Sequence, residues 1–509
     1  MLPLRLNCLC KHSTTLLRRL KQKPPKYLQI SRTYKELATI SQFQDHEVYS
    51  MHRPDPDMRD GPIVCPGNEA DYLILGGGIM GQALAFNIWK AMETTTVLKA
   101  SKHYGCKIVV VEQDPSLLES STALSAGGIR TQFSNPANIQ LSMLTAEFIR
   151  DIKVHLSTVD NQDPDAQYNP QGYLTMATQS GASRLMKNYQ TQVETGAKIM
   201  LFTQDHLKET FPWINVEGIE LATYGLENEG WFDPMMYVNS FKAKNPTLNI
   251  HNVKGKVVGF KNIRSDPAYL PNIVVMADGK EVIQDEKIEG VYIKMPEHEK
   301  PIFVKSGTTV ICCGAMSGEV ARLAGVGEGR PEDGKYLEYE LPVERRKRYV
   351  YVVHCPDAPM FDFPFLVDPS GAYARRDGFG GKYICGMSPT EENEPDITNL
   401  DVDCNFFDEE VWPRLAHRIP AFEKLKMTSS WAGYYDYNTY DQNGVIGPHP
   451  YHLNLYFLTG FSGHGLQQSY GATKALADLI VKGETDIDIS PFSFNRFISN
   501  QPLLETNII

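Results

Sequence analysis

The chain has 509 residues, more than one hydrophobic core usually supports, so two domains are expected. The formal net charge of -11 argues against nucleic acid as a partner, because binding to phosphate groups requires a basic surface. The nine cysteines form no C-x-x-C pair and no cluster at zinc spacing, so we expect neither a disulfide framework nor a metal site.

The first 35 residues differ from the rest of the chain. Their charged side chains are all Lys or Arg, Leu, Ser and Thr lie between them, and the first acidic residue is Glu36. This composition is typical of a mitochondrial transit peptide, so we expect residues 1–35 to direct the protein to the matrix or the matrix face of the inner membrane. The alternative is a basic tail without a targeting role. The polar, proline-rich residues 36–70 are interpreted as a linker.

The next segment predicts a strand, a glycine turn and a helix. Residues 71–75 are an apolar run suited to a buried parallel strand, and residues 83–89 have helical character. The glycines between them make a membrane-spanning helix over 72–89 a poor interpretation. After a polar insertion at 91–106, a second buried strand ends at Glu112. The pattern predicts a β-α-β unit.

Similar strand–glycine–helix patterns occur at 308–324 and 455–482, with strand-rich sequence between them. We therefore predict an α/β fold, with one Rossmann-type domain assembled from both ends of the chain and an inserted domain built on an antiparallel sheet (α+β). The predicted segments are 71–165, 301–335 and 431–490 for the dinucleotide domain, 166–300 (mostly) and 336–430 for the substrate or cap domain, and 491–509 for a C-terminal tail.

The glycine turn carries the first chemical motif. Gly76, Gly78 and Gly81 form G-x-G-x-x-G between a strand and a helix. Such glycines allow a tight turn, close approach of backbone to pyrophosphate, and close packing of helix on strand, while the helix N-terminus favours phosphate. Glu112 ends the second strand, where a carboxylate can accept hydrogen bonds from ribose hydroxyls. The alternative is a glycine-rich turn without a ligand.

Two further segments could face the same ligand. Residues 120–130 are rich in Ser, Thr and Gly and end at Arg130, which could contact a cofactor or a substrate carboxylate; the alternative is a surface loop. Residues 460–465 open the last helix, whose N-terminus would stabilise negative charge on a bound ring. His464 in this turn could touch cofactor or substrate, or only pack, and both interpretations remain open.

The aromatic segment 431–438 and a basic strand complete the candidates. Tyr434 and its neighbours could wall a substrate pocket or pack in a core. Arg346 and Arg348 are two residues apart and share a face of a strand, so they could offer two guanidinium groups to a carboxylate. The alternative is a solvated basic edge.

Together these motifs resemble the glycine oxidase/D-amino-acid oxidase (DAO) family of FAD enzymes, which includes sarcosine and dimethylglycine dehydrogenases. The blocks that carry the resemblance are DYLILGGGIMGQALA, KIVVVEQD, STALSAGGIR, TTVICCGAMSGEVARLAG, WAGYY, NGVIGP and LYFLTGFSGHGL.

The resemblance implies bound FAD, with its pyrophosphate at Gly76, Gly78 and Gly81 and its adenosine ribose at Glu112. It also assigns the remaining cofactor contacts to Ser121, Thr122, Ala126, Gly127, Val257, Gly314, Gly463 and Gly465. His464, Tyr434 and Arg348 are the candidate catalytic residues. Leu124 and Ser125 stand where covalent members carry a histidine, so FAD is expected to be non-covalent. Gln467 replaces a lysine of the sarcosine oxidases, which argues against their specificity.

A second set of blocks is similar to a mitochondrial branch of this family that is known in animals for the assembly of respiratory complex I. These blocks are LENEGWFDP (226–234), LPVERRKRYVYVVHCP (341–356), SGAYARRDG (370–378), WAGYYDYNTYDQNGVIGPHP (431–450) and the terminal 507–509. The resemblance implies complex I subunits or assembly intermediates as partners, and a peripheral association with the inner membrane.

Two other functions compete with this one. A metabolic dehydrogenase would oxidise a small N-methylated or D-amino acid by hydride transfer from the amine α-carbon to flavin N5. An NAD-dependent Rossmann dehydrogenase is disfavoured, because residues 120–130 and 460–465 would have no role in it.

Overall fold

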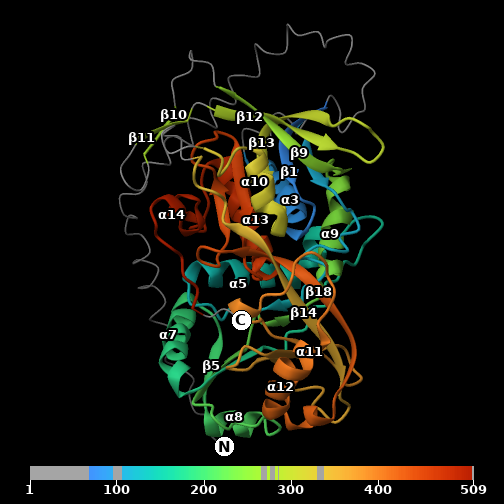
Figure 1. Cartoon of the computed structure of the whole chain (residues 1–509), viewed down its shortest axis with the longest axis vertical. Helices are drawn as coiled ribbons and strands as arrows, with labels where there is room; N and C mark the ends of the chain where they lie inside the picture. Colours follow the sequence, from blue (N-terminus) through green and yellow to red (C-terminus); the bar gives the residue numbers. More distant parts are fainter. Residues whose placement is uncertain are drawn as a thin grey trace, which may run out of the picture.

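The structure, a computed structural model, describes residues 68–95, 106–264, 272–275, 281–284, 286–329 and 337–506. The predicted transit peptide, nearly all of the predicted linker and the terminal 507–509 lie outside these residues. Figure 1 shows two bodies stacked along the long axis of the molecule. Each is built on an eight-stranded sheet, called here the first sheet (upper body) and the second sheet (lower body).

The first sheet has the strand order β19-β20-β13-β1-β2-β8, and β12 and β9 extend it from β13. The five strands from β20 to β8 run parallel, whereas β19, β12 and β9 run antiparallel to their neighbours. Its strands are β1 (Glu69–Leu75), β2 (Ile108–Glu112), β8 (His251–Lys254), β9 (Lys256–Arg264), β12 (Glu286–Lys294), β13 (Ile302–Ile311), β19 (Val445–Pro448) and β20 (Leu455–Thr459).

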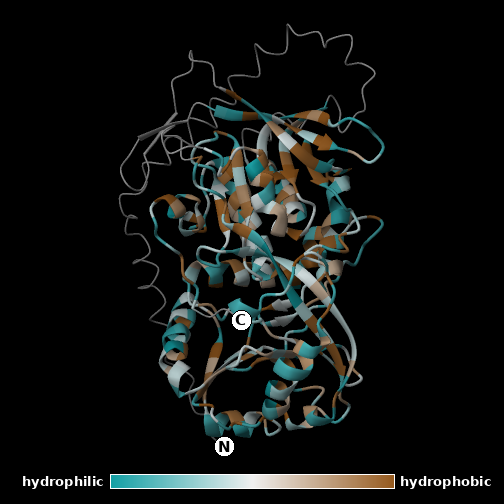
Figure 2. Ribbon diagram, in the orientation of Figure 1, coloured by the Kyte–Doolittle hydropathy of each residue, from teal (hydrophilic) through white to brown (hydrophobic). Residues whose placement is uncertain are grey.

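Both faces of this sheet are covered, which explains the apolar runs of β1, β2 and β20. In β1, Ile74 packs into a core with α3 (Ile79–Thr94) and α13 (Gly465–Lys482). Leu73 points the other way, into a core with β12 and α10 (Ser317–Leu323). Figure 2 shows hydrophobic residues running through the strands and helices of this body. Helices, parallel sheet and antiparallel strands therefore form three layers.

The second sheet has the order β18-β14-β17-β16-β15-β4-β6-β5, in which only β15 and β4 are parallel neighbours. Its strands are β4 (Tyr173–Ala177), β5 (Ile199–Thr203), β6 (Leu221–Gly225), β14 (Val343–His354), β15 (Phe365–Val367), β16 (Tyr373–Arg376), β17 (Lys382–Gly386) and β18 (Lys426–Asn438). One face of it packs against the chain around α8 (Gln204–Thr210) and α12 (Trp412–Arg418) in a single core. The opposite face is left for the first body.

The remaining elements surround these two sheets. They are α5 (Pro136–Arg150), α6 (Ile152–Leu156), α7 (Gln179–Thr195), α9 (Pro234–Thr247), α11 (Cys404–Phe406), α14 (Asn495–Ile498), and the strand pairs β3 (Gly128–Ile129) with β7 (Gly230–Trp231) and β10 (Asn272–Val275) with β11 (Glu281–Gln284). Within the described chain, every helix is too short or too polar to cross a lipid bilayer.

The long strands β14 and β18 connect the two bodies. They pair from Val343 opposite Asn438 to His354 opposite Lys426. Val343 belongs to a core of the first body, whereas Tyr351 belongs to the core of the second. Figure 1 shows the two strands descending together from beside α13 toward α11 and α12. This ribbon therefore ties the position of one sheet to that of the other.

The structure confirms the predicted α/β fold class, with one sheet assembled from both ends of the chain and a second, inserted sheet. Sheet membership differs from the predicted segments in two places. The strands β8, β9 and β12 join the first sheet, although 166–300 was assigned mostly to the cap domain. β18 joins the second sheet, although most of it falls in 431–490. Alternating polarity identifies a strand but does not specify its partner, which is the reason for both differences.

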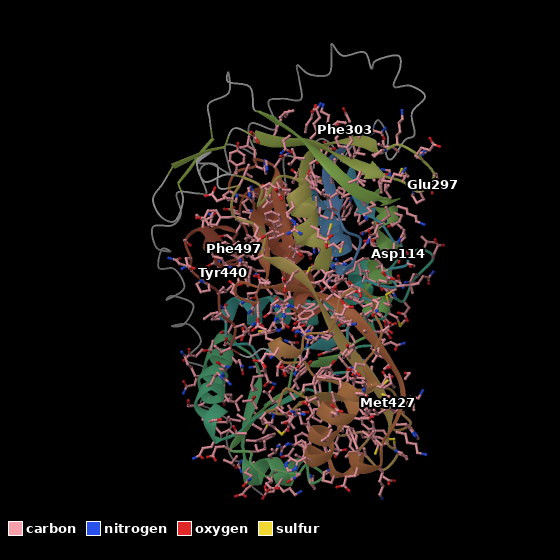
Figure 3. The ribbon with its side chains drawn as sticks, in the orientation of Figure 1. Asp114, Glu297, Phe303, Met427, Tyr440 and Phe497 are labelled. Carbon is pink, nitrogen blue, oxygen red and sulfur yellow. The ribbon has the colours of Figure 1, made fainter. Side chains whose placement is uncertain are left out.

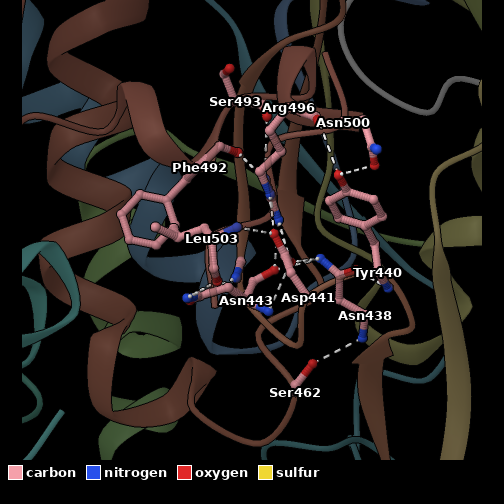
Figure 4. A network of polar contacts seen from close by, with 11 residues as sticks. Asn438, Tyr440, Asp441, Asn443, Ser462, Phe492, Ser493, Arg496, Asn500 and Leu503 are labelled. Carbon is pink, nitrogen blue, oxygen red and sulfur yellow. Dashed lines mark hydrogen bonds and ion pairs between the residues drawn. The ribbon is translucent and has the colours of Figure 1, made fainter. Parts of the chain in front are cut away.

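The segment predicted as a C-terminal tail is packed into the first body. Arg496 donates from Nε and Nη2 to both carboxylate oxygens of Asp441, at 2.6 and 3.0 Å, and from Nη2 to the carbonyl of Asn443 (Figure 4). The Arg496 and Asp441 side chains are 4% and 0% exposed. Phe497 packs edge-on against Tyr440, with ring centroids 5.2 Å apart (Figure 3). A buried ion pair thus anchors the end of the described chain.

This anchor can be tested by breaking the pair. R496M leaves Asp441 as a buried carboxylate without its cation, so we expect the free energy of unfolding to fall by about 3–5 kcal/mol in denaturant titrations. The control D163N breaks the exposed Lys153–Asp163 pair and should leave stability nearly unchanged. Equal effects of the two variants would contradict the anchoring role.

Candidate functional site

A cavity of about 660 Å³ lies where the two bodies meet. One side is formed by the carboxyl ends of the parallel strands of the first sheet, where ligands of open α/β sheets bind. The other side is formed by the exposed face of the second sheet. The cavity is lined by thirteen of the predicted residues: Gly76, Gly78, Glu112, Ser121, Thr122, Ala126, Val257, Gly314, Arg348, Tyr434, Gly463, His464 and Gly465. Sequence segments hundreds of residues apart are therefore brought to one site.

The glycine turn after β1 has the geometry of a phosphate cradle. Gly76 has φ +104°, and a Cβ there would lie 2.3 Å from the carbonyl oxygen of Cys312 on the neighbouring strand end. A Cβ on Gly78 would meet only the hydroxyl of Thr122, at 3.2 Å. That hydroxyl accepts a hydrogen bond from the N–H of Ile79, at the start of α3. The backbone and the helix N-terminus are thus open to an anion.

Two predicted glycines serve packing and do not line the cavity. A Cβ on Gly81 would lie within 1.9 Å of the carbonyl oxygen of Gly76, so only glycine lets α3 pack against the turn. Gly127 has φ +75°, and a Cβ there would lie 2.2 Å from the carbonyl oxygen of Phe232. Both glycines support the cradle without forming its surface.

Glu112 ends β2 at the rim of the cavity. Its Oε2 accepts from the N–H of Gly77 at 2.7 Å, and its Oε1 accepts from the N–H of Asp114 at 2.9 Å. These two bonds fix the carboxylate beside the glycine turn. Each carboxylate oxygen keeps a further acceptor site, which suits hydrogen bonds from ribose hydroxyls.

The second turn, at residues 460–465, is held by β18. The buried carboxylate of Asp436 accepts from the N–H of Phe461 at 3.0 Å, and the carbonyl of Asp436 accepts from the N–H of Ser462. Burial raises the pKa of Asp436 to about 6. Ser462 and Gly463 have positive φ values of 50° and 88°, and α13 begins at Gly465. The positive end of that helix therefore opens at the cavity.

His464 is a buried, neutral side chain in the cavity wall. Burial, reinforced by the charge of Arg130, lowers the pKa of His464 to about 3. Its ring packs edge-on against Phe133, with centroids 5.3 Å apart, and its Nδ1 has no hydrogen-bond partner within the described residues. The side chain thus both packs in the turn and borders the cavity. A neutral imidazole at this position cannot donate a proton as imidazolium at neutral pH.

Beneath this wall lies a polar group that the sequence motifs did not reveal. Glu229 is fully buried and accepts from the backbone N–H and the hydroxyl of Thr131 and from the amide of Gln132. Burial raises the pKa of Glu229 to about 6. Arg130, also fully buried, donates from its backbone to the Gln467 side chain at 2.9 Å and from Nη1 to the carbonyl of Gln132. No local spacing links Glu229 to residues 98 positions away.

The cap wall carries the other predicted residues. The hydroxyl of Tyr434 donates to the carbonyl of Ile397 at 2.7 Å, while the carbonyl of Tyr434 accepts from the hydroxyl of Ser121. Arg348 lines the cavity, and its guanidinium lies over the ring of Tyr435 at 4.7 Å. The sequence suggested the tyrosines of this segment as pocket walls but named only Tyr434, and not Tyr435, as a catalytic candidate. The sequence contains the signal, since it neighbours Tyr434, but only the strand geometry shows which tyrosine pairs with Arg348.

Arg346 and Arg348 share a carboxylate partner that belongs to the chain itself. Both guanidinium groups contact Glu394, at 2.9 and 2.8 Å. These two side chains are 16% and 18% exposed, so neither is a solvated member of the basic edge. No group of three His, Cys, Asp or Glu side chains in the described part of the chain is arranged to hold a metal ion.

Residues 71–479 match the family model of the FAD dependent oxidoreductases (DAO), and the chain belongs to this family. Its cofactor is accordingly FAD, and the glycine cradle, the Glu112 carboxylate and the helix terminus of α13 fit that group. The resemblance drawn from the sequence motifs is thereby confirmed.

Curated relatives identify a narrower group. The chain is 48% identical to FAD-dependent oxidoreductase domain-containing protein 1 of Xenopus laevis over 87% of this chain and 86% of that one. The protein of the same name from Bos taurus is 45% identical over 87% of this chain and 88% of that one. A monomeric sarcosine oxidase of a Bacillus species is 32% identical over 34% of this chain and 46% of that one.

Solved structures support the fold. L-proline dehydrogenase from P. horikoshii has a TM-score of 0.66 at 21% identity, covering 85% of this chain and 99% of that one. Glycine oxidase from Geobacillus kaustophilus has a TM-score of 0.63 at 18% identity, covering 84% and 98%.

The cradle makes a direct prediction about cofactor content. G78V places a branched side chain where Gly78 leaves the cavity open, so we expect the purified variant to hold less than about a tenth of the wild-type FAD. The control G259V changes a glycine of β9 whose Cβ would meet nothing closer than 3.7 Å. Absorbance near the flavin bands measures FAD, and circular dichroism checks folding. Full FAD content in folded G78V would contradict the placement of the cradle.

The mode of FAD attachment gives a second prediction. Denatured wild-type protein should release its FAD into the supernatant. Flavin that stays with the denatured chain would contradict non-covalent binding.

Proposed function

We propose that the protein is a mitochondrial FAD-dependent oxidoreductase that acts on a small amine and supports the assembly of respiratory complex I. The enzymatic part rests on one observation, a cavity in which the FAD cradle of the first sheet continues into a side-chain wall on the second sheet. When bound, FAD supplies hydride acceptance from a carbon next to nitrogen. A site bordered by the two sheets in this way can align a small substrate beside the cofactor.

The side chains in the cavity are suited to such a reaction. The neutral His464 and the phenol of Tyr435 can orient an amine through hydrogen bonds, and burial raises the pKa of Tyr435 to about 12, which keeps it protonated. The N-terminus of α13 favours negative charge in the cavity. Asp436 is committed to the turn that it holds. Oxidation of an amine depends on alignment more than on a strong base, so the site needs no further acid or base.

The role in complex I assembly rests on different support. The blocks at 226–234 and 341–356 resemble the mitochondrial branch described above, and relatives with 44–48% identity extend that likeness over most of the chain. The basic, acid-free residues 1–35 support a location in the matrix. On this proposal the partners are complex I subunits or assembly intermediates. The alternative is a metabolic dehydrogenase of a small N-methylated or D-amino acid without an assembly role.

The amine-oxidising part predicts loss of flavin colour on anaerobic mixing with a substrate. We expect bleaching of the flavin absorbance by at least one compound of a panel containing sarcosine, dimethylglycine, D-amino acids and simple N-methylamines, because each offers a hydrogen on carbon next to nitrogen. Reduction with dithionite gives the absorbance of the fully reduced flavin, and a panel of matched alcohols is the control. A flavin that dithionite reduces but that no amine of the panel bleaches would count against this part.

The assembly part predicts a defect when the protein is lost. Cells without the protein should contain less fully assembled complex I on native gels, and the wild-type chain should restore it. Complementation with G78V separates the two roles, since that variant is expected to fold without FAD. A normal amount of assembled complex I in the absence of the protein would contradict the assembly role. Restoration of that amount by G78V would show that assembly does not require the flavin.

A further inference from the structure

Arg348 is one of two arginines, with Arg345, that β14 presents to the cavity. It lies opposite Gly433 in the β14–β18 ribbon, and Tyr435 and Tyr373 line the same part of the cavity. The guanidinium lies 4.7 Å from the ring centroid of Tyr435. An arginine in such a place is well suited to clamp a carboxylate through two parallel hydrogen bonds.

The donors of Arg348 are already committed. Nη1 donates to Glu394 Oε2 at 2.8 Å and to the carbonyl of Lys347 at 2.8 Å. Nη2 donates to Glu394 Oε1 at 2.8 Å and to the hydroxyl of Tyr435 at 2.8 Å. A guanidinium has five N–H groups, so these four bonds leave only the one on Nε, which has no partner in the described residues. A second carboxylate therefore cannot take the two-pronged site.

Glu394 reaches Arg348 from outside the cavity. It lies in the segment between β17 and α11 and is not among the residues that line the cavity. Arg346 also contacts Oε1 of Glu394, at 2.9 Å, and the Glu394 side chain is 20% exposed. Burial alone would raise the pKa of Glu394, but the hydrogen bonds and charges of Arg348 and Arg346 outweigh it and hold that pKa below its usual value. The carboxylate is thus ionised and held by two arginines.

The other basic residues that line the cavity either contact partners within the chain or belong to the first sheet. Arg345 pairs with Glu319 at 3.0 Å. Arg130 is fully buried, lies over the ring of Phe133 at 4.5 Å, and donates from Nη1 to a backbone carbonyl. Lys256 starts β9, in the first sheet. The three arginines of β14 (Arg345, Arg346 and Arg348) are therefore each paired with a carboxylate of the chain, and the cap wall presents a neutralised surface.

We infer that Glu394 is a built-in carboxylate that sets substrate specificity: the cavity selects an amine that carries no free carboxylate at the Arg348 end, such as a carboxamide, an ester or a simple amine. The inference rests on the proposed function, since it assumes that a small amine binds in this cavity. A substrate carboxylate would have to displace Glu394 and leave it without its main cation, or lie unpaired beside it. Either arrangement costs binding energy, which is how a site rejects the wrong ligand.

The test compares matched ligands by equilibrium binding to the FAD-loaded protein. The pairs are N-methylglycinamide against sarcosine and benzamide against benzoate, followed by the change in flavin absorbance and by calorimetry without turnover. We expect the wild type to bind the uncharged member of each pair at least about tenfold more tightly, which corresponds to about 1.4 kcal/mol. E394A frees the Nη1 and Nη2 donors of Arg348, so it should reverse this preference. E394Q removes the charge of Glu394 but keeps its size, so it should reduce the difference in affinity between the members of each pair.

E344Q is the matched control. Glu344 pairs with Arg346 Nε at 2.6 Å but has no bond to Arg348, so its loss should leave the ligand preference unchanged. FAD content and thermal midpoint confirm that each variant is folded, and E394Q keeps the test usable if E394A is unstable. A wild type that prefers carboxylates, an unchanged preference in both Glu394 variants, or no binding of any ligand would overturn the inference. Retained preference without flavin bleaching by any amine would instead overturn the proposed oxidation alone.

Discussion

The pairing of β14 with β18 is the constraint on which the site depends. Its two ends lie in different cores, at Val343 in the first body and at Tyr351 in the second. Between them the ribbon carries both sides of the site: Arg348 and Tyr435 form part of the cap wall, and Asp436 holds the turn that opens α13. A change in the twist or register of this one ribbon would move the cap wall relative to the cofactor cradle.

The cradle itself depends on backbone that only glycine allows. Gly76 requires a positive φ, and Gly81 brings α3 so close to the turn that a single added carbon would collide with a carbonyl. Glu112 then joins the turn to the end of β2 through the N–H of Gly77. These contacts join neighbouring strand ends, so the glycine turn, α3 and β2 hold one another in position on the cofactor side of the cavity.

Charge pairing inside the cap gives the site its selectivity. Arg346 and Arg348 lie two residues apart on β14, and both are satisfied by the single carboxylate of Glu394. The pairing keeps two arginines in a partly buried wall without a ligand, where unpaired cations would be costly. The same carboxylate then competes with any acidic substrate. On the proposed function, one ion cluster therefore stabilises the cap wall and also selects the amine that binds against it.

Contiguous patterns in the sequence determined the glycine turn, the carboxylate Glu112 at the end of β2, the α/β class and the assembly of one domain from both chain ends, because strands, turns and helices follow from the polarity of neighbouring residues. The same patterns placed Arg346 and Arg348 on one face of a strand. Only the tertiary structure decided that Glu394, 46 residues after Arg348, would be their carboxylate, and that Glu229 would pair with Thr131. It also decided that β18 would join the second sheet. Such partners meet through the packing of distant segments, which depends on the whole fold rather than on any local spacing.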